Sequence, residues 1–156
     1  MAVKAQIKAG EVQVEVAVAG DYTSTTTWAI LDSGFNGDIV IDINRAMRLG
    51  LQPAGAGGVT LADGSTTDVP LFTGYVRIGD ETPKEAIFII AGDELLLGMN
   101  LMKDYSICFN ASKNEATVKA KMAVGEAETI SVSRVYGASP LDTLRTTLKA
   151  ISPQAR

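Results

Sequence analysis

Polar and apolar residues alternate along much of the segment from residue 3 to residue 121. A period of two is typical of β-strands that have one buried face. Sequences suited to tight turns separate the alternating segments, among them Ala9-Gly10 and Asp63-Gly64. The pattern predicts an all-β chain with strands near residues 3–8, 12–18, 25–31, 38–41, 59–62, 67–71, 72–78, 85–90, 105–109 and 115–119.

A short helix is expected after the fourth of these strands. Asp42 is a typical helix N-cap, and Gly50 is suited to the left-handed conformation that ends a helix. Between them, Ile43, Ala46 and Met47 fall on one face. An apolar stripe of this kind predicts that the face is buried.

Three other segments carry specific expectations. The end of the third strand, residues 28–31, is continuously apolar and is expected to be buried on both faces. The glycine-rich run 53–58 is expected to form a flexible loop. The apolar run 95–97 precedes Gly98 and a helical turn that is expected near residues 100–103.

The character of the sequence changes at Met122, which suggests a first unit, residues 1–121, and a C-terminal extension, residues 122–156. The extension contains one expected strand, residues 129–133, and a helix start at residues 139–142. A single apolar stripe continues along this helix through Leu141, Leu144, Leu148 and Ile151. The stripe predicts a C-terminal helix that packs against a sheet of its own chain or of a partner.

Composition narrows the chemistry that the chain can carry out. Its 156 residues include no histidine and one cysteine, Cys108. Hydrolase sites that depend on histidine are therefore excluded, as are zinc sites built from histidine or from several cysteines. The 18 acidic and 14 basic residues give a net charge of −4, which argues against nucleic-acid binding. With a lone thiol, no secretory leader and no apolar run of membrane-spanning length, a cytoplasmic protein away from membranes is expected.

The triplet Asp32-Ser33-Gly34 is the clearest candidate for chemistry. It follows an apolar strand and precedes another strand, so the aspartate is expected at a sharp turn. Taken alone, such a triplet is more often a turn in which the aspartate bonds its own backbone. A second feature favours a functional role: the segment 94–102, about sixty residues later, is an apolar run that ends in Gly98 and a short helix.

Together the two features resemble the retropepsin-like aspartic proteases of clan AA, in particular their single-domain prokaryotic form. The resembling segments are residues 29–37, the hairpin Leu61-Ala62-Asp63-Gly64-Ser65 at the place of the family's flap, and residues 96–101. The likeness covers roughly residues 10–121. It implies the acid protease fold, a closed barrel with short helices, in a homodimeric protein.

The resemblance also implies peptide hydrolysis. Enzymes of this family use two aspartates that share one proton, one as general base on a water molecule and the other as acid toward the scissile carbonyl; aspartic proteases are the standard example of such a pair. This chain has one such triplet, so the second aspartate must be Asp32 of a second copy. The implied activity is that of an aspartic endopeptidase on extended peptide or protein substrates, with no cofactor and no metal.

The roles of the other site residues follow from the same resemblance. Ser33 is expected to donate across the dimer axis and to hold the two active-site loops together. Gly34 and Asn36 are expected to offer backbone groups to the substrate. The flap tip is expected at Ala62, Asp63 and Gly64, where it closes over the substrate and excludes water.

The chain departs from the retroviral members of the family at several positions. Its triplet has Ser33 where threonine is commoner, and its flap has the polar Asp63 and Ser65 where retroviral flaps are rich in glycine. Where those enzymes have an acid and an arginine that pair, this chain has Asn36 and Met99. Both partners are missing together, so no buried charge is left unpaired, although the dimer lacks that ion pair. Gly98 is expected to pack beneath the active-site loop, with Leu96 and Leu97 in the core.

Two other functions stay open at the level of sequence. One is a catalytically silent peptide-binding or regulatory module on the same fold, because fold does not determine function. The other is an unrelated β-barrel binding domain, in which the Asp32 residues of two copies never meet. Acidic residues at 80–81 and 93–94 lack the spacing of a calcium loop, and the glycine run 55–58 lacks the Lys-Ser/Thr of a phosphate loop.

Overall fold

The computed structural model describes residues 3–121. The extension 122–156, with its predicted strand and helix, lies outside the described residues. Strands dominate the described part, which confirms the predicted all-β class. In chain order the elements are β1 (Ala5–Lys8), β2 (Glu11–Ala19), β3 (Ser24–Leu31), β4 (Ile39–Ile41), α1 (Ile43–Leu49), β5 (Gln52–Thr60), β6 (Thr66–Ile78), β7 (Lys84–Ile90), β8 (Leu96–Leu97), α2 (Met99–Met102), β9 (Tyr105–Asn110) and β10 (Glu115–Ala120).

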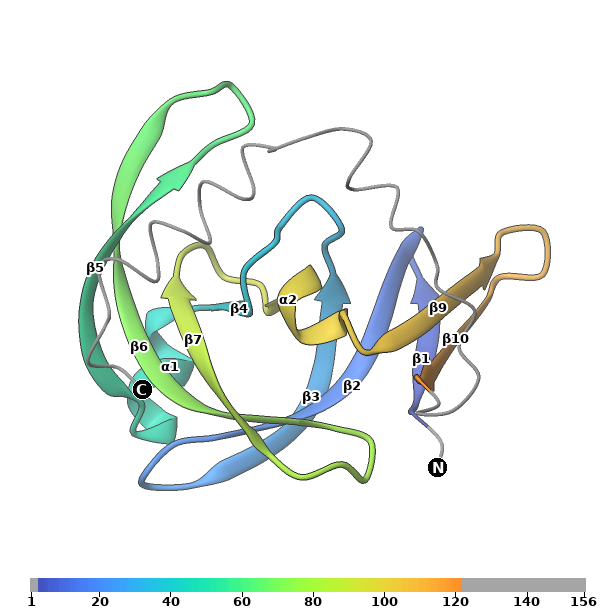
Figure 1. Ribbon diagram of the computed structural model, residues 1–156, viewed down its shortest axis with the longest axis horizontal. Helices are drawn as coiled ribbons and strands as arrows, with labels where there is room; N and C mark the ends of the chain where they lie inside the picture. Colours follow the sequence, from blue (N-terminus) through green and yellow to red (C-terminus); the bar gives the residue numbers. More distant parts are fainter. Residues whose placement is uncertain (1–2, 122–156) are drawn as a thin grey trace.

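Six strands form a closed barrel (Figure 1). The strand β2 pairs with β3 on one side and with β6 on the other, and β8, β4 and β7 complete the ring between β3 and β6. The β3–β8 and β4–β7 pairs are parallel, and the other pairs are antiparallel. Outside the ring, β1 pairs with β2, and a bridge between Val3 and Val118 links the β9–β10 hairpin to the N-terminal segment.

The core fills the inside of the barrel. On β2, Val14, Val16 and Val18 are at most 1% exposed, whereas the residues between them are only partly buried. This is the alternation that a strand with one inward face requires. The same cluster includes inward residues of the other barrel strands, among them Ile39, Ile41, Val76, Phe88 and Leu97.

The hairpins that the turn sequences predicted are confirmed. Strands pair across Ala9-Gly10, across the segment 61–65 and across the segment 111–114. The prediction of a flexible loop at residues 53–58 is wrong, because this run lies within β5 and pairs with β6. A register shift after Pro53 absorbs the irregularity there, and sheet pairing outweighs the low strand propensity of glycine.

The predicted boundaries of α1 are confirmed, but its predicted buried face is wrong. The Asp42 side chain accepts a hydrogen bond from the N–H of the third residue after it at 2.9 Å, and Gly50 has a φ of 76°. Ile43 and Met47 are 45% and 60% exposed. The helix packs on the barrel through Ala46 and Leu49, so its buried face is rotated about the helix axis from the predicted one.

The outer surface of β3 also differs from expectation. Trp28 is 37% exposed, whereas Ala29 is fully buried, so residues 28–31 are not buried on both faces. Trp28 pairs with Glu15 of β2, and side chains at directly opposed positions share one face of the sheet. Among the described residues, no helix has the length and apolarity needed to cross a membrane.

Candidate functional site

Asp32 directly follows β3 and is held there by the neighbouring strand β8. Its backbone N–H donates to the carbonyl of Leu97 at 3.0 Å, and its own carbonyl accepts from the N–H of Phe35 at 3.1 Å. The side-chain oxygen Oδ1 accepts from the N–H of Gly34 at 2.9 Å. The aspartate therefore closes its own turn, and its carboxylate is oriented by the backbone of the predicted triplet.

The far side of this loop is bonded to the start of α2. The N–H groups of Gly98, Met99 and Asn100 donate to the carbonyls of Asp38, Phe35 and Gly37, at 2.8, 2.8 and 3.1 Å. These groups lie at the beginning of a helix, where backbone donors have no partner within the helix itself. The loop 32–38 and the segment 97–100 therefore form one bonded unit, although they are distant in sequence.

Asp38 is a residue of the site that the sequence analysis missed. Its Oδ2 accepts from the N–H of Ile87 at 2.8 Å, and its Oδ1 accepts from the side-chain amide of Asn100. Asp38 is partly buried between these partners. One feature of the sequence could have indicated its role. Asp38 directly precedes a strand of apolar residues, and a carboxylate that is partly buried with such a strand needs hydrogen-bond partners.

Two glycines allow this close packing. A Cβ on Gly98 would overlap the carbonyl oxygen of Gly37, and it would lie 2.7 Å from the Phe35 ring. A Cβ on Gly37 would itself overlap that ring. The expectation that Gly98 packs beneath the loop that follows Asp32 is confirmed by this geometry. Beside it, Leu97 is fully buried and Leu96 is partly buried.

The predicted loop residues differ in their accessibility. Ser33 and Gly34 are exposed and Asp32 is partly exposed. Asn36 is only 8% exposed. The triplet is therefore accessible from solvent, whereas Asn36 belongs to the packed base of the loop.

The predicted flap tip is an ordered turn. The N–H of Gly64 donates to the carbonyl of Leu61 at 2.9 Å, and the N–H of Leu61 donates to the carbonyl of Ser65 at 2.8 Å. Asp63 accepts from the Ser65 hydroxyl at 2.6 Å and from the Ser65 N–H at 2.8 Å. These two hydrogen bonds, the hydroxyl first, lower the pKa of the Asp63 carboxyl. The residues of the tip, including Ala62, are exposed.

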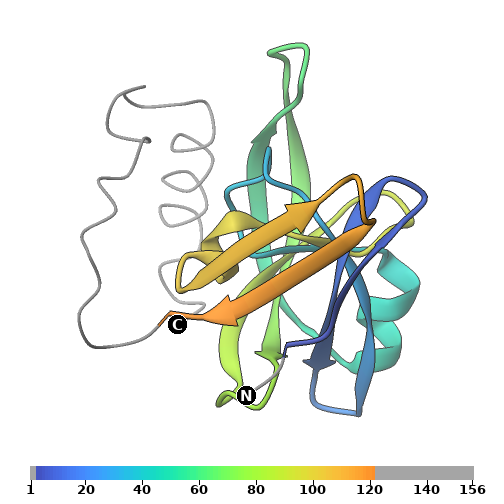
Figure 2. The same cartoon turned by 90° about the vertical axis from the view of Figure 1, so that its right-hand side faces the viewer.

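The β5–β6 hairpin and the loop between β3 and β4 extend from the same end of the barrel, as the two perpendicular views show (Figures 1 and 2). A small second cluster lies between them. Phe35 of the loop, Leu71 of β6 and Ile89 of β7 form its buried centre, and Val59 and Val69 of the hairpin pack against it. The base of the hairpin and the Asp32 loop therefore share one apolar support.

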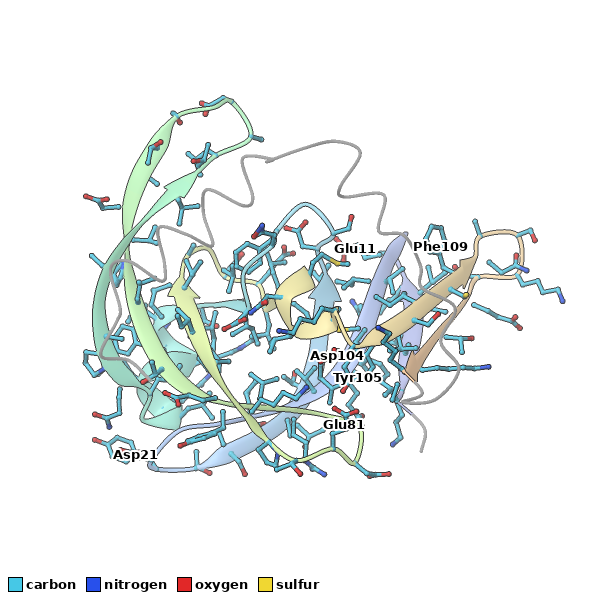
Figure 3. The ribbon with its side chains drawn as sticks, viewed as in Figure 1. Glu11, Asp21, Glu81, Asp104, Tyr105 and Phe109 are labelled. Atoms are coloured by element: carbon cyan, nitrogen blue, oxygen red, sulfur yellow. The ribbon has the colours of Figure 1, made fainter. Side chains whose placement is uncertain are left out.

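A groove of about 640 Å³ lies beside the triplet. Its lining includes Ser33, and Leu31 and Met99 contribute apolar surface next to it. Glu11 and Phe109, from β2 and β9, also line the groove and are labelled in Figure 3. Phe109 is 67% exposed, so the groove presents apolar surface beside the Asp32 loop, whose Ser33 also lines it.

A polar cluster joins the β6–β7 turn to the start of β9 (Figure 3). The Tyr105 hydroxyl donates to Glu81 at 2.7 Å, and Lys84 lies 3.8 Å from Glu81 and 3.5 Å from Asp104. Burial raises the pKa of the Tyr105 hydroxyl, and the bond to Glu81 raises it further. The cluster attaches the β9–β10 hairpin to the barrel.

Within residues 3–121, no three histidine, cysteine, aspartate or glutamate side chains are grouped in a way that could hold a metal ion. The sequence matches no model of a known protein family and no curated protein.

Proposed function

We propose that this chain is a retropepsin-like aspartic endopeptidase that acts as a homodimer. Asp32 of one copy and Asp32 of the other form the catalytic pair. One aspartate, as the carboxylate, takes a proton from a water molecule, while the other, which carries the shared proton, donates it to the scissile carbonyl oxygen, and the water oxygen bonds to the carbonyl carbon. The peptide C–N bond then breaks as the amine leaves with a proton.

One observation carries the proposal: Asp32 lies in a loop that is fixed by β8 and α2, at the barrel end from which the β5–β6 hairpin also extends. A catalytic carboxylate needs such a fixed position, because small displacements of reacting groups reduce the rate strongly. The hairpin tip supplies a cover that can exclude water from a bound peptide.

The need for a second copy follows from the single triplet. One protomer contributes one Asp32, and a pair that shares a proton requires two. The exposed Ser33 and Gly34 allow two loops to approach, and the apolar groove beside Ser33 offers surface to bury. These features are compatible with a two-fold axis that passes between the loops.

The test is cleavage of an unbiased peptide mixture at several pH values by the full chain. Asp32→Asn should abolish cleavage, whereas Asp93→Asn, in an exposed turn, should leave it unchanged. Both variants should keep the unfolding midpoint of the parent protein. Intact cleavage by Asp32→Asn rejects the mechanism, and peptide binding without cleavage at any pH supports a silent peptide-binding module instead.

Mixing the parent protein with Asp32→Asn tests the shared site. If each active site needs one aspartate from each copy, an equal mixture that exchanges subunits should retain about a quarter of the activity of undiluted parent protein. A monomeric enzyme would retain about half. If the mixture retains half of the activity, in proportion to its content of parent protein, the active site is not shared between two copies.

A further inference from the structure

The strand β3 has an open edge along its first half. On one side it pairs with β2 from Ser24 to Ile30, but on the other it meets β8 only at its last two residues. The N–H groups of Ile30 and Asp32 donate to the carbonyls of residues 95 and 97 on that side. Because backbone groups alternate between the two sides of a strand, those of Thr26 and Trp28 point to the same edge, where no other strand of residues 3–121 lies.

The open edge is accessible to solvent and offers regular pairing groups. Thr26 and Trp28 are exposed, and in the described segment their N–H and carbonyl groups on this edge have no backbone partner. Residues two apart on a strand are separated by about 7 Å. An extended peptide presents donors and acceptors at the same spacing, so it can pair here as one added strand, the mode known as strand addition.

A hollow of about 280 Å³ lies against this edge, between β3 and α1. Thr25 and Thr27 line it from β3, and Arg45 and Arg48 line it from the helix. Its apolar lining consists of Val18, Leu49 and Leu95. Side chains opposite Thr25 and Thr27 on an added strand share their face of the sheet, so they meet two guanidinium groups and a small apolar surface.

The two arginines favour an acidic ligand. The Nε of Arg45 lies 3.2 Å from Asp42, which leaves the other N–H groups of this guanidinium for further partners. Arg48 is exposed and forms no ion pair with any residue in the described segment 3–121. Guanidinium groups bind carboxylates through pairs of charge-assisted hydrogen bonds. The hollow is therefore a basic place on a chain whose net charge is −4.

The same charges oppose the pairing of two copies through this edge. An edge-to-edge dimer of β3 strands would bring Arg45 and Arg48 of both copies to one junction, and like charges there disfavour the contact. An acidic segment of a different protein has no such conflict, because its carboxylates complement the guanidinium groups. Charge therefore selects the occupant, and the backbone edge sets its extended conformation.

We propose that the open edge of β3 binds an extended acidic segment of another protein by strand addition. The backbone of that segment pairs with Thr26 and Trp28, and its acidic side chains lie against Arg45 and Arg48. An apolar side chain two positions from an acidic one occupies the apolar part of the hollow. Thr26 precedes Asp32 by six residues, about 20 Å along the strand, so this proposal does not depend on the peptidase activity.

Amide hydrogen exchange shows whether the edge is free. The protein is the full chain with Asp32→Asn, so that the proposed peptidase activity cannot consume a peptide probe. The amides of Thr26 and Trp28 should exchange at least about tenfold faster than those of Thr25 and Thr27, which face β2. Equally slow exchange of all four would show that the edge is already covered, by residues 122–156 or by a second copy, and overturns the proposal.

A synthetic peptide tests the chemistry of the occupant. The probe is the capped peptide Thr-Glu-Thr-Val-Thr-Glu-Thr, in which the glutamate and valine side chains share one side of an extended strand. Saturating peptide should slow exchange at Thr26 and Trp28 by at least about threefold. The same peptide with lysine for glutamate should bind at least about tenfold more weakly. Absence of binding, binding that leaves both amides unchanged, or equal affinity for the two peptides overturns the proposal.

A charge reversal on α1 tests the role of the arginines. Arg48→Glu should weaken binding of the glutamate peptide by about three- to tenfold and strengthen binding of the lysine peptide, which also shows that the variant is folded. Lys113→Glu, the same change of charge in the distant β9–β10 turn, should change neither affinity. Equal losses in Arg48→Glu and Lys113→Glu overturn the proposal.

Discussion

The side-chain amide of Asn100 donates to the carboxylate of Asp38, and this bond joins the loop that follows Asp32 to the first turn of α2. The second oxygen of the same carboxylate accepts from the backbone N–H of Ile87 on β7. Three segments that are far apart in sequence therefore meet at one acidic side chain. Asp38 therefore helps to hold the loop that follows Asp32.

Removal of the Asp38 carboxylate should destabilise the protein. Asp38→Ala leaves the Ile87 N–H and the Asn100 amide without their acceptor in a partly buried place, which should lower the free energy of unfolding by about 2–4 kcal/mol. Denaturant unfolding measures this loss. Asp93→Ala, which removes an exposed carboxylate, should change it by less than about 0.5 kcal/mol. Similar values for both variants would contradict the anchoring role of Asp38.

A methyl group at position 98 should disturb the loop. Gly98→Ala places a Cβ against the Gly37 carbonyl and the Phe35 ring, and overpacking of this kind should cost about 3 kcal/mol. The comparison is Gly64→Ala at the hairpin tip, where the new Cβ meets open space and only the left-handed φ of 85° opposes it, at about 1 kcal/mol. Unfolding curves that rank the two variants in the opposite order would refute the packing argument.

The tip of the β5–β6 hairpin should keep the negative charge of Asp63 in mild acid. The Ser65 hydroxyl and N–H lower the pKa of the Asp63 carboxyl, so the carboxylate and its two bonds persist as pH falls through the usual range of an aspartate. The two hydrogen bonds to Ser65, and the ordered turn that they stabilise, are lost only when the pH falls through the lowered pKa of Asp63. In an NMR titration, Ser65→Ala should raise the Asp63 pKa. An unchanged titration would show that the hydroxyl does not stabilise the charge.

Stability should decline in alkali because of Tyr105. Burial and Glu81 raise the pKa of its hydroxyl, so the folded state keeps a proton that the unfolded chain releases above about pH 10. The stability that this group contributes is therefore complete below pH 10 and is lost as pH rises further.

Tyr105→Phe is the direct test of this pH dependence. At neutral pH the variant should lose about 1 kcal/mol, the typical value of one hydrogen bond. Above pH 10 its unfolding midpoint should fall less steeply than that of the parent protein. Tyr75→Phe, on an exposed residue, is the matched control and should follow the parent curve. Parallel curves for the parent protein and Tyr105→Phe would exclude Tyr105 as the cause.

Local patterns were sufficient to predict most elements of the fold. Period-two alternation located the strands, and the caps at Asp42 and Gly50 located α1, because these signals act between residues close in sequence. The buried face of α1 was predicted wrongly because contact with the barrel, and not the count of apolar residues, selects Leu49 over Met47. The glycine-rich part of β5 was missed because its pairing with β6 is a tertiary contact.

The candidate site was predicted only in part for the same reason. Asp32 and Gly98 belong to short motifs, and a motif can be identified without the fold. Asp38 has no motif, and its importance appears only when Asn100 and Ile87 are brought to it from distant parts of the chain. A polar residue that supports a site through tertiary hydrogen bonds, as Asp38 does, therefore cannot be identified from a single sequence.

The two-residue strand β8 has a consequence for the order of folding. It lies between β3 and β4, and β4 is bounded on its other side by β7. The strand that follows the Asp32 loop, β4, therefore pairs only with segments that come much later in the chain, and β3, which pairs with β2 on one side, meets β8 on the other. Contacts of such long sequence separation form slowly. During synthesis, the Asp32 loop cannot form its bonds to residues 97–100 before residue 100 has left the ribosome, so a shorter chain carries the triplet in a loop that α2 does not yet hold.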